Sequence, residues 1–314
     1  MANNTPLSGL SDAAGGIILP EAQGAILTNG VLQQSGALSL AGDKRTTSSR
    51  REAFGIWNGT PTAEFVGEGG TKPVTGAEFA GGTLNIKKVA SIVTFTDEMI
   101  EDVMSGDLNI LVDSGVRDAI SDVVDANAVG LDSGTAITGA FDSELVGTTQ
   151  VVEYNGAVQD GLALAVSAAM GSLEANGYGD LAILVSGDVN RHLRDARLTG
   201  VSGGGTASVT STALVQGLYQ PNGDPFYGLP RAVSTNLNTL SESAGAGKTV
   251  AVVVARQNLH VRIRHDVRVS RSNEATVGGT SLWQNDLTGL RYVTRLGFYV
   301  HDLNRAVVKI NNAS

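Results

Sequence analysis

Residues 57–102 read WNGTPTAEFVGEGGTKPVTGAEFAGGTLNIKKVASIVTFTDEMIED, and this stretch decides how the chain is interpreted. Its first half is polar and rich in glycine, with eight glycines between Gly55 and Gly82. Alternating apolar residues follow, and then acids of the kind that begin a helix. A hairpin with so long a glycine-rich tip has no core of its own to bury. Such a segment is either disordered or ordered by another chain.

The hairpin is expected to span residues 46–95. On its return strand Leu84 and Ile86 face one way, and Asn85 and Lys87 face the other, as period-two alternation predicts. The candidate contacts to a neighbouring chain are the large apolar side chains of the hairpin and two charged ones near its tip. These residues are Trp57, Phe65, Val66, Glu68, Lys72 and Phe79.

Two helices are predicted after the hairpin. A short one runs from Thr96 to Met104, and Asp107 is a good N-cap for the next. The second helix would end near Ala128 and span about 30 Å. Its predicted apolar face has the cleanest helical period in the chain. That face consists of Leu108, Leu111, Val112, Val116, Ala119, Ile120, Val123 and Val124.

An α/β unit is predicted over residues 158–255. Its first helix carries apolar residues at helical spacing and ends at Gly177, a residue that suits a helix C-terminus. A second helix covers about residues 188–196. Short apolar strands are expected at residues 181–185, 231–234 and 249–255.

The last part of the chain is predicted to be rich in strands. Residues 259–270 alternate without interruption, over a length greater than most strands. The alternation places His265 on the apolar face. The opposite face carries a basic row of Arg262, Arg264 and Arg268. A partner strand is expected at 286–300, and residues 307–310 add a terminal strand.

Composition excludes several classes of function. The chain has no Cys and its four His lack HxxxH spacing, so thiolate chemistry is impossible and a metal site built from His is not expected. The formal net charge is -9, whereas proteins that read DNA are usually basic. Sequence-specific DNA binding is therefore not expected, although an acidic container for DNA is consistent with this charge.

Neither a membrane segment nor a signal peptide is evident. The first 16 residues lack a basic start followed by an apolar run. The longest aliphatic run, at 249–255, is far too short to span a bilayer. The chain is therefore expected to be made in the cytoplasm and to stay out of membranes.

Motifs for catalysis fail on inspection. The segment SESAGAGKT at 241–249 resembles a phosphate-binding loop, but Glu242 stands where that motif requires glycine. Its Gly-Lys pair also leads into a predicted strand and not into a helix. No nucleophile elbow with plausible partners stands out. The sequence therefore predicts neither an enzyme nor a cofactor site.

Charge is distributed unevenly along the chain. Residues 97–125 contain nine acids and one base, a net charge of -8, while residues 256–314 contain nine bases and four acids, a net charge of +5. The two segments are expected to meet, within a subunit or between subunits. Arg262, Arg264 and Arg268 are the candidates in the basic segment for contacts with carboxylates of a neighbouring subunit. The rival interpretation directs the basic row at DNA phosphates.

An ordered series of segments resembles the major capsid proteins of tailed phages. The series contains IILPEAQGAIL, AEFVGEGG, NIKKVASIVTFTDEMIED, the long helix, ILVSGDVNRHLRDARLTG, GLYQPNGDPFYGLPRAVSTNL and LTGLRYVTRLGFYVHDLNRAVVKI. The resemblance implies an α+β fold of the Hong Kong 97-like type. Its implied parts are an N-terminal arm (1–45), an extended loop (46–95), a peripheral domain with a spine helix and a long β-ribbon (96–129 and 256–300) and an axial α/β domain (130–255 and 301–314).

The resemblance also implies a function. The chain would be the major capsid protein of a tailed bacteriophage, made in the host cytoplasm and found in the virion. It would self-assemble into pentamers and hexamers of an icosahedral head shell, which matures around double-stranded DNA. A portal and a decoration protein are further implied partners. Because the chain begins at Met1 with the arm, any scaffolding protein would be separate, or unnecessary. The alternative is the shell of an encapsulin-type nanocompartment, and an NTPase is a distant third.

Covalent joining of subunits occurs in some members of the family. There a loop lysine bonds to an asparagine of the next subunit, and Lys72 with Asn273 or Asn285 is the candidate pair here. Most members lack this bond, and no catalytic carboxylate can be assigned for it.

Overall fold

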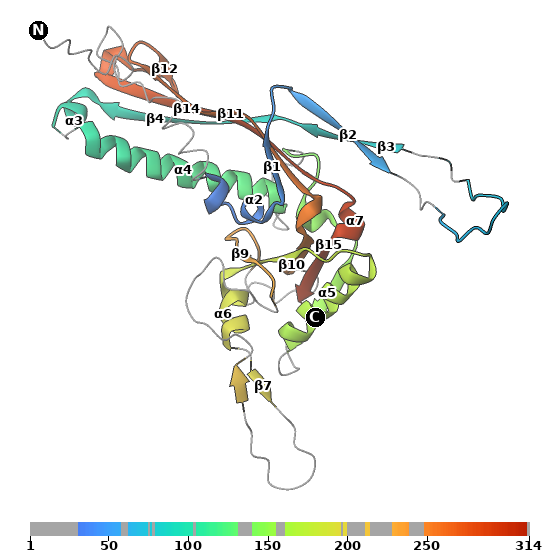
Figure 1. Cartoon of the computed structure of the whole chain (residues 1–314). Coiled ribbons are helices and arrows are strands. Elements are labelled where there is room, and N and C mark those ends of the chain that lie inside the picture. The colour runs from blue at the N-terminus through green and yellow to red at the C-terminus, as the bar shows by residue number, and fades with distance from the viewer. Residues whose placement is uncertain are drawn as a thin grey trace, which may run out of the picture.

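Two lobes and a projecting ribbon make up the subunit (Figure 1). This computed structural model describes residues 31–57, 62–74, 76, 79–102, 105–130, 140–154, 161–195, 197–199, 211–213, 228–238 and 248–312. One lobe is built on a four-stranded sheet and the other on a five-stranded sheet. Residues 31–34, at the start of the described part of the chain, are helical.

The long-sheet lobe contains strands β1 (Asp43–Thr46), β11 (Leu259–Ser272), β14 (Leu287–Val300) and β4 (Lys87–Thr96), in the order β1-β11-β14-β4. Strands β11 and β14 pair antiparallel along their length, which confirms the two long strands expected from alternation. The hairpin β12 (Thr276–Val277) and β13 (Thr280–Ser281) joins them, and Gly278 and Gly279 supply the positive φ angles of its turn.

Helices α3 (Asp97–Asp102) and α4 (Ser105–Val129) follow β4, and α4 runs along the sheet (Figure 1). The long helix is confirmed, but it begins at Ser105. Asp107 therefore lies in its first turn and is not the predicted cap. The buried stripe is narrower than predicted, because Val116, Ile120 and Val124 are buried whereas Ala119 and Val123 are exposed. The side chains of Leu108, Leu111 and Val112 lie outside the described residues.

The five-stranded lobe is a mixed sheet in the order β5-β15-β10-β6-β9. Its strands are β5 (Val151–Tyr154), β15 (Val307–Asn312), β10 (Thr249–Ala255), β6 (Leu181–Val185) and β9 (Arg231–Val233). Every residue of β6 and β10 is buried, which is typical of strands covered on both faces. The strands predicted here are confirmed.

Helices α5 (Gly161–Ala175), α6 (Gly187–Asp195) and α7 (Leu303–Ala306) flank the same lobe. The first two confirm the predicted pair, and Gly177 has the predicted positive φ of 89° after α5. The small hairpin β7 (Arg197–Thr199) and β8 (Ser211–Ala213) projects away at the far end (Figure 1).

A buried carboxylate joins α4 to the short helix α2 (Gly36–Leu40) and to the end of β9. Asp125 of α4 is 4% exposed. It accepts hydrogen bonds from Ser35 Oγ at 2.9 Å and the Ala37 amide at 2.8 Å, and also from Ser234 Oγ. Burial of a charge is tolerated when donors satisfy it, so this hub fixes α2 between the two lobes.

Candidate functional site

The projecting ribbon consists of β2 (Arg51–Trp57) and β3 (Phe79–Asn85). The two strands pair antiparallel from Arg51 with Asn85 to Trp57 with Phe79, and they lead away from both lobes (Figure 1). The continuous return strand predicted from alternation is divided at Ile86. Before it β3 pairs with β2, and after it β4 pairs with β14. We call β2 and β3 the loop ribbon.

The loop tip, residues 62–74, lies at the far end of this ribbon and exposes apolar side chains. Phe65 is 111% exposed, Val74 93% and Val66 39%. Glu68 and Lys72 are also exposed. The side chains of Trp57 and Phe79 lie outside the described residues. An exposed apolar group on a projecting segment is typical of an interaction site.

We call the base of the loop ribbon, where Arg51 pairs with Asn85, the loop root. It is held by Arg262 of β11, whose side chain is 3% exposed. Its Nε donates to both carboxylate oxygens of Glu52 at 3.0 Å, and its Nη2 donates to Asp43 Oδ2 at 2.8 Å. Asp43 lies in β1 and Glu52 in β2, so one guanidinium binds the strand that follows α2 and the loop ribbon. Arg262 was predicted to contact another subunit. The structure instead places it inside this one.

Ionisation of the Asp43–Arg262 pair follows from these contacts. Burial alone would raise the pKa of Asp43, but hydrogen bonds from Arg262 and His260 and the charges of Arg262 and Arg45 together lower it. Burial would lower the pKa of Arg262, but the bonds to Asp43 and Glu52 raise it. Both groups are therefore charged at neutral pH, as a charge-assisted bond requires.

Ring stacking and close packing complete the loop root. The Phe54 ring of β2 stacks on His260 at 5.1 Å and on Tyr299 at 5.8 Å between centroids. Leu84 is fully buried and fits against Gly297, where an added Cβ would approach Leu84 Cδ2 to 2.5 Å. Only glycine allows this approach. The direction of the loop ribbon is thus fixed within the subunit.

A bulge in β11 changes the predicted basic row. Ile263 pairs with Leu296 but His265 pairs with Arg295, so Arg264 is an extra residue without a partner on β14. This shift and a second one between His265 and Arg268 place His265, contrary to the prediction, on the face of Arg262 and Arg268. Arg268 is exposed, and its Nη2 lies 3.4 Å from His265 Nδ1.

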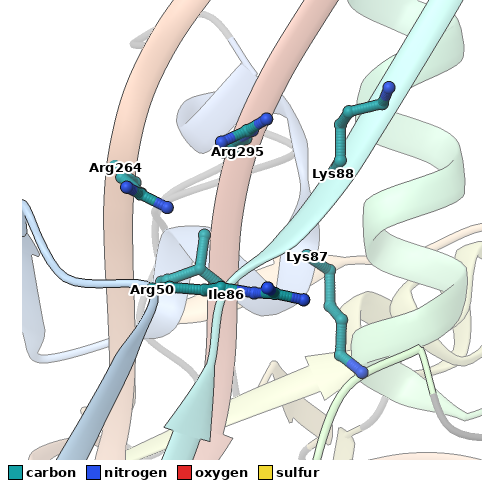
Figure 2. A pocket seen from close by; sticks show the side chains of 6 residues that line it. All are labelled: Arg50, Ile86, Lys87, Lys88, Arg264 and Arg295. Carbon is teal, nitrogen blue, oxygen red and sulfur yellow. The ribbon is translucent and has the colours of Figure 1, made fainter.

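The bulge residue lines a basic hollow of about 510 Å³ at the loop root. Figure 2 shows its six side chains, which are Arg50, Ile86, Lys87, Lys88, Arg264 and Arg295. They come from the residue before β2, the junction of β3 with β4, and strands β11 and β14. Arg264 Nε is buried without a hydrogen-bond partner. Among these residues, only Arg264 was predicted from the sequence as a contact between subunits. The adjacent cations Lys87 and Lys88 were the sequence feature that could have pointed to the rest of the hollow.

The acidic segment 97–125 is largely used inside the subunit. Asp97 accepts from Thr288 at 2.6 Å, Asp118 from Gln34 at 2.7 Å, and Asp122 from Thr235 at 3.3 Å. Asp125 is the hub described above. Four of the five acidic side chains that the structure describes here therefore have partners, and Glu98 is the fifth. No ion pair joins this segment to residues 256–312 among the described side chains.

No helix within the described ranges is long and apolar enough to cross a membrane. The same residues contain no group of three His, Asp or Glu side chains arranged to hold a metal ion.

The comparison with family models decides the identity of the fold. The model described as "Phage capsid family" matches residues 15–311. This chain belongs to the phage capsid family. It is a major capsid protein, a structural protein that associates with itself to form the head shell, and its place is in the virion. A search of curated proteins found no significant match.

Solved structures of phage capsid proteins share the fold. A chain from Mycobacterium phage Bobi is 20% identical, with 89% of this chain and 91% of that chain covered and a TM-score of 0.66. A chain from Microbacterium phage Oxtober96 is 20% identical, covers 88% and 91%, and has a TM-score of 0.65. The capsid of the empty GTA particle, computed with C5 symmetry, is 12% identical over 90% of both chains, with a TM-score of 0.65. The α+β, Hong Kong 97-like fold is thereby confirmed, and the encapsulin alternative is not favoured.

Proposed function

We propose that this capsid protein closes an icosahedral shell from pentamers and hexamers, and that the loop ribbon clamps each subunit to a neighbour. The observation that carries this proposal is the ribbon itself, which is fixed at its root and exposes Phe65 and Val74 at its tip. A contact from the tip of one subunit to the body of the next is head-to-tail, and such contacts close into rings when the rotation permits.

Further partners follow from this role. We propose a portal, a decoration protein and a separate scaffolding protein as partners, with synthesis in the host cytoplasm and no catalytic activity of the shell protein. The DNA inside is enclosed without sequence-specific binding, which the net charge of -9 favours. Within the subunit, we propose residues 1–45 as the arm and the lobe with α4 as the peripheral domain.

Removal of the loop tip tests the clamp. Joining Trp57 to Phe79 through a two-residue turn keeps the last strand pair and deletes residues 58–78. We expect a folded, soluble protein that no longer forms shells, measured by sedimentation and electron microscopy. The matched control deletes part of the hairpin between β7 and β8, residues 201–208. Normal shells from the tip deletion would refute the clamp, and wild-type protein that stays monomeric in all buffers would refute shell formation.

A further inference from the structure

The basic hollow gathers positive charge without a counter-charge. Arg50, Lys87, Lys88, Arg264 and Arg295 make no hydrogen bond or ion pair with any side chain in the described part of the chain. Like charges this close repel one another, and Arg264 Nε is already withdrawn from solvent without an acceptor. The hollow is therefore suited to an anion that another molecule supplies.

The size of the hollow favours carboxylates of a peptide segment. Its volume of about 510 Å³ has room for a few side chains. A DNA duplex, whose major groove alone is about 12 Å wide, is too broad to enter it. Guanidinium groups bind carboxylates through paired hydrogen bonds, and the three arginines and two lysines of the hollow can bind a pair of acids.

The loop tip carries a suitable pair of acids. Glu64 and Glu68 are exposed, and neither has a partner among the described residues. The acidic segment 97–125 is a poorer source, because four of its five described acids already accept hydrogen bonds within the subunit.

The tip of one subunit cannot fill its own hollow. The hollow lies at the loop root, and the seven residues of β2 alone carry the chain about 23 Å away from it. Figure 1 shows the loop ribbon leading outward from that root. We propose that Glu64 and Glu68 of one copy bind the basic hollow of an adjacent copy. This inference rests on the proposed shell and names the receptor site of its clamp.

Apolar contacts reinforce the match. Phe65 and Val66 lie between the two acids. Ile92 of β4 is 51% exposed and shares a face of the strand with Lys88. When the carboxylates enter the hollow, Phe65 covers Ile92, and both large apolar side chains leave water.

Charge exchange tests the contact. Reversal of the tip (Glu64→Lys with Glu68→Lys) and reversal of the hollow (Arg264→Glu with Arg295→Glu) should each lower the assembled fraction about tenfold. All four changes together should restore assembly. Glu274→Lys, at an exposed acid elsewhere, is the matched control and should assemble normally. Circular dichroism and the melting temperature establish that each variant folds.

Three results overturn the proposal. One is a combined variant that assembles no better than either reversal alone. Another is a hollow reversal that assembles empty shells normally, and if it then fails only to retain DNA, the hollow binds phosphate. The third is the absence of a specific cross-link between subunits in assembled shells. This experiment also tests the contact if the charge-reversal variants fail to fold. Because the chain has no Cys, Glu68→Cys mixed with Lys88→Cys should give a bis-maleimide dimer, and Glu274→Cys mixed with Lys88→Cys should not. Shells that form without the first dimer refute this contact while leaving shell formation intact.

Discussion

Arg262 shows how a single side chain sets the direction of the loop ribbon. It binds Asp43 and Glu52, which precede it by 219 and 210 residues. Alternation in β11 predicted the face on which Arg262 lies, but no local pattern encodes partners so far away in sequence. Its interpretation as a contact between subunits was therefore wrong, although its charge had been recognised.

Loss of Arg262 should destabilise the subunit. Arg262→Ala removes the printed partner of Glu52 and one of the three partners of Asp43, both partly buried, so we expect the free energy of unfolding to fall by about 3 kcal/mol. Urea denaturation of unassembled protein measures this change. Arg268→Ala, at an exposed arginine of the same strand, is the control and should change stability by less than about 0.5 kcal/mol. Equal effects of the two substitutions would contradict the role of the buried bonds.

The same ion pair should respond to acid. The pKa of Asp43 is lower in the folded protein than its ordinary value of 3.8. A carboxyl with a depressed pKa contributes stability above its unfolded pKa, and that contribution is lost as pH falls through its folded pKa. Asp43→Asn should therefore be destabilising at pH 7, and its deficit relative to wild type should shrink below about pH 4. A deficit that is constant from pH 7 to pH 2 would rule out this linkage.

At the scale of elements, sequence periodicity located most helices and strands but not their interruptions. Helices α4, α5 and α6 and strands β10, β11 and β14 lie where the pattern predicted them. The division at Ile86 was missed because Leu84 and Ile86 keep their alternation while the pairing partner changes from β2 to β14. The bulge at Arg264 was missed for a similar reason, since one extra residue leaves no mark on an alternating sequence.

The Asp125 hub allows a test of how α2 is held between the lobes. Asp125→Ala removes the acceptor of two hydroxyl groups and one backbone amide, all buried. Since each unsatisfied buried donor costs about 1–3 kcal/mol, we expect a loss of about 3 kcal/mol in denaturant unfolding. Faster hydrogen exchange at the Ala37 amide should accompany it. Asp122→Ala, at the exposed acid three residues earlier in α4, is the control. Hydrogen exchange at the Ala37 amide that is equally fast in both variants would contradict the role of Asp125.

At the scale of the whole molecule, charge was predictable as a total but not in its placement. The contrast between residues 97–125 and 256–314 suggested that the two segments meet. The structure brings them together at Asp97, which accepts a hydrogen bond from Thr288. The acids Asp118, Asp122 and Asp125 instead bind other parts of the subunit. The unpartnered cations gather at the loop root from β4, β11, β14 and the residue before β2. These strands come together only in the folded subunit, so no single segment of the sequence predicts the hollow.

Salt should therefore weaken assembly through the loop root. The screening length falls from about 10 Å at 0.1 M salt to about 3 Å at 1 M, and each exposed ion pair contributes only about 0.2–1 kcal/mol. A closed shell repeats each contact in every subunit, so small losses per contact accumulate. We expect the assembled fraction of wild type to fall between 0.1 M and 1 M salt in light scattering. The variant with Arg264→Glu and Arg295→Glu has already lost this attraction, so its lower assembled fraction should not fall further with salt. An equal fall in both proteins would mean that the salt-sensitive contact lies elsewhere on the subunit.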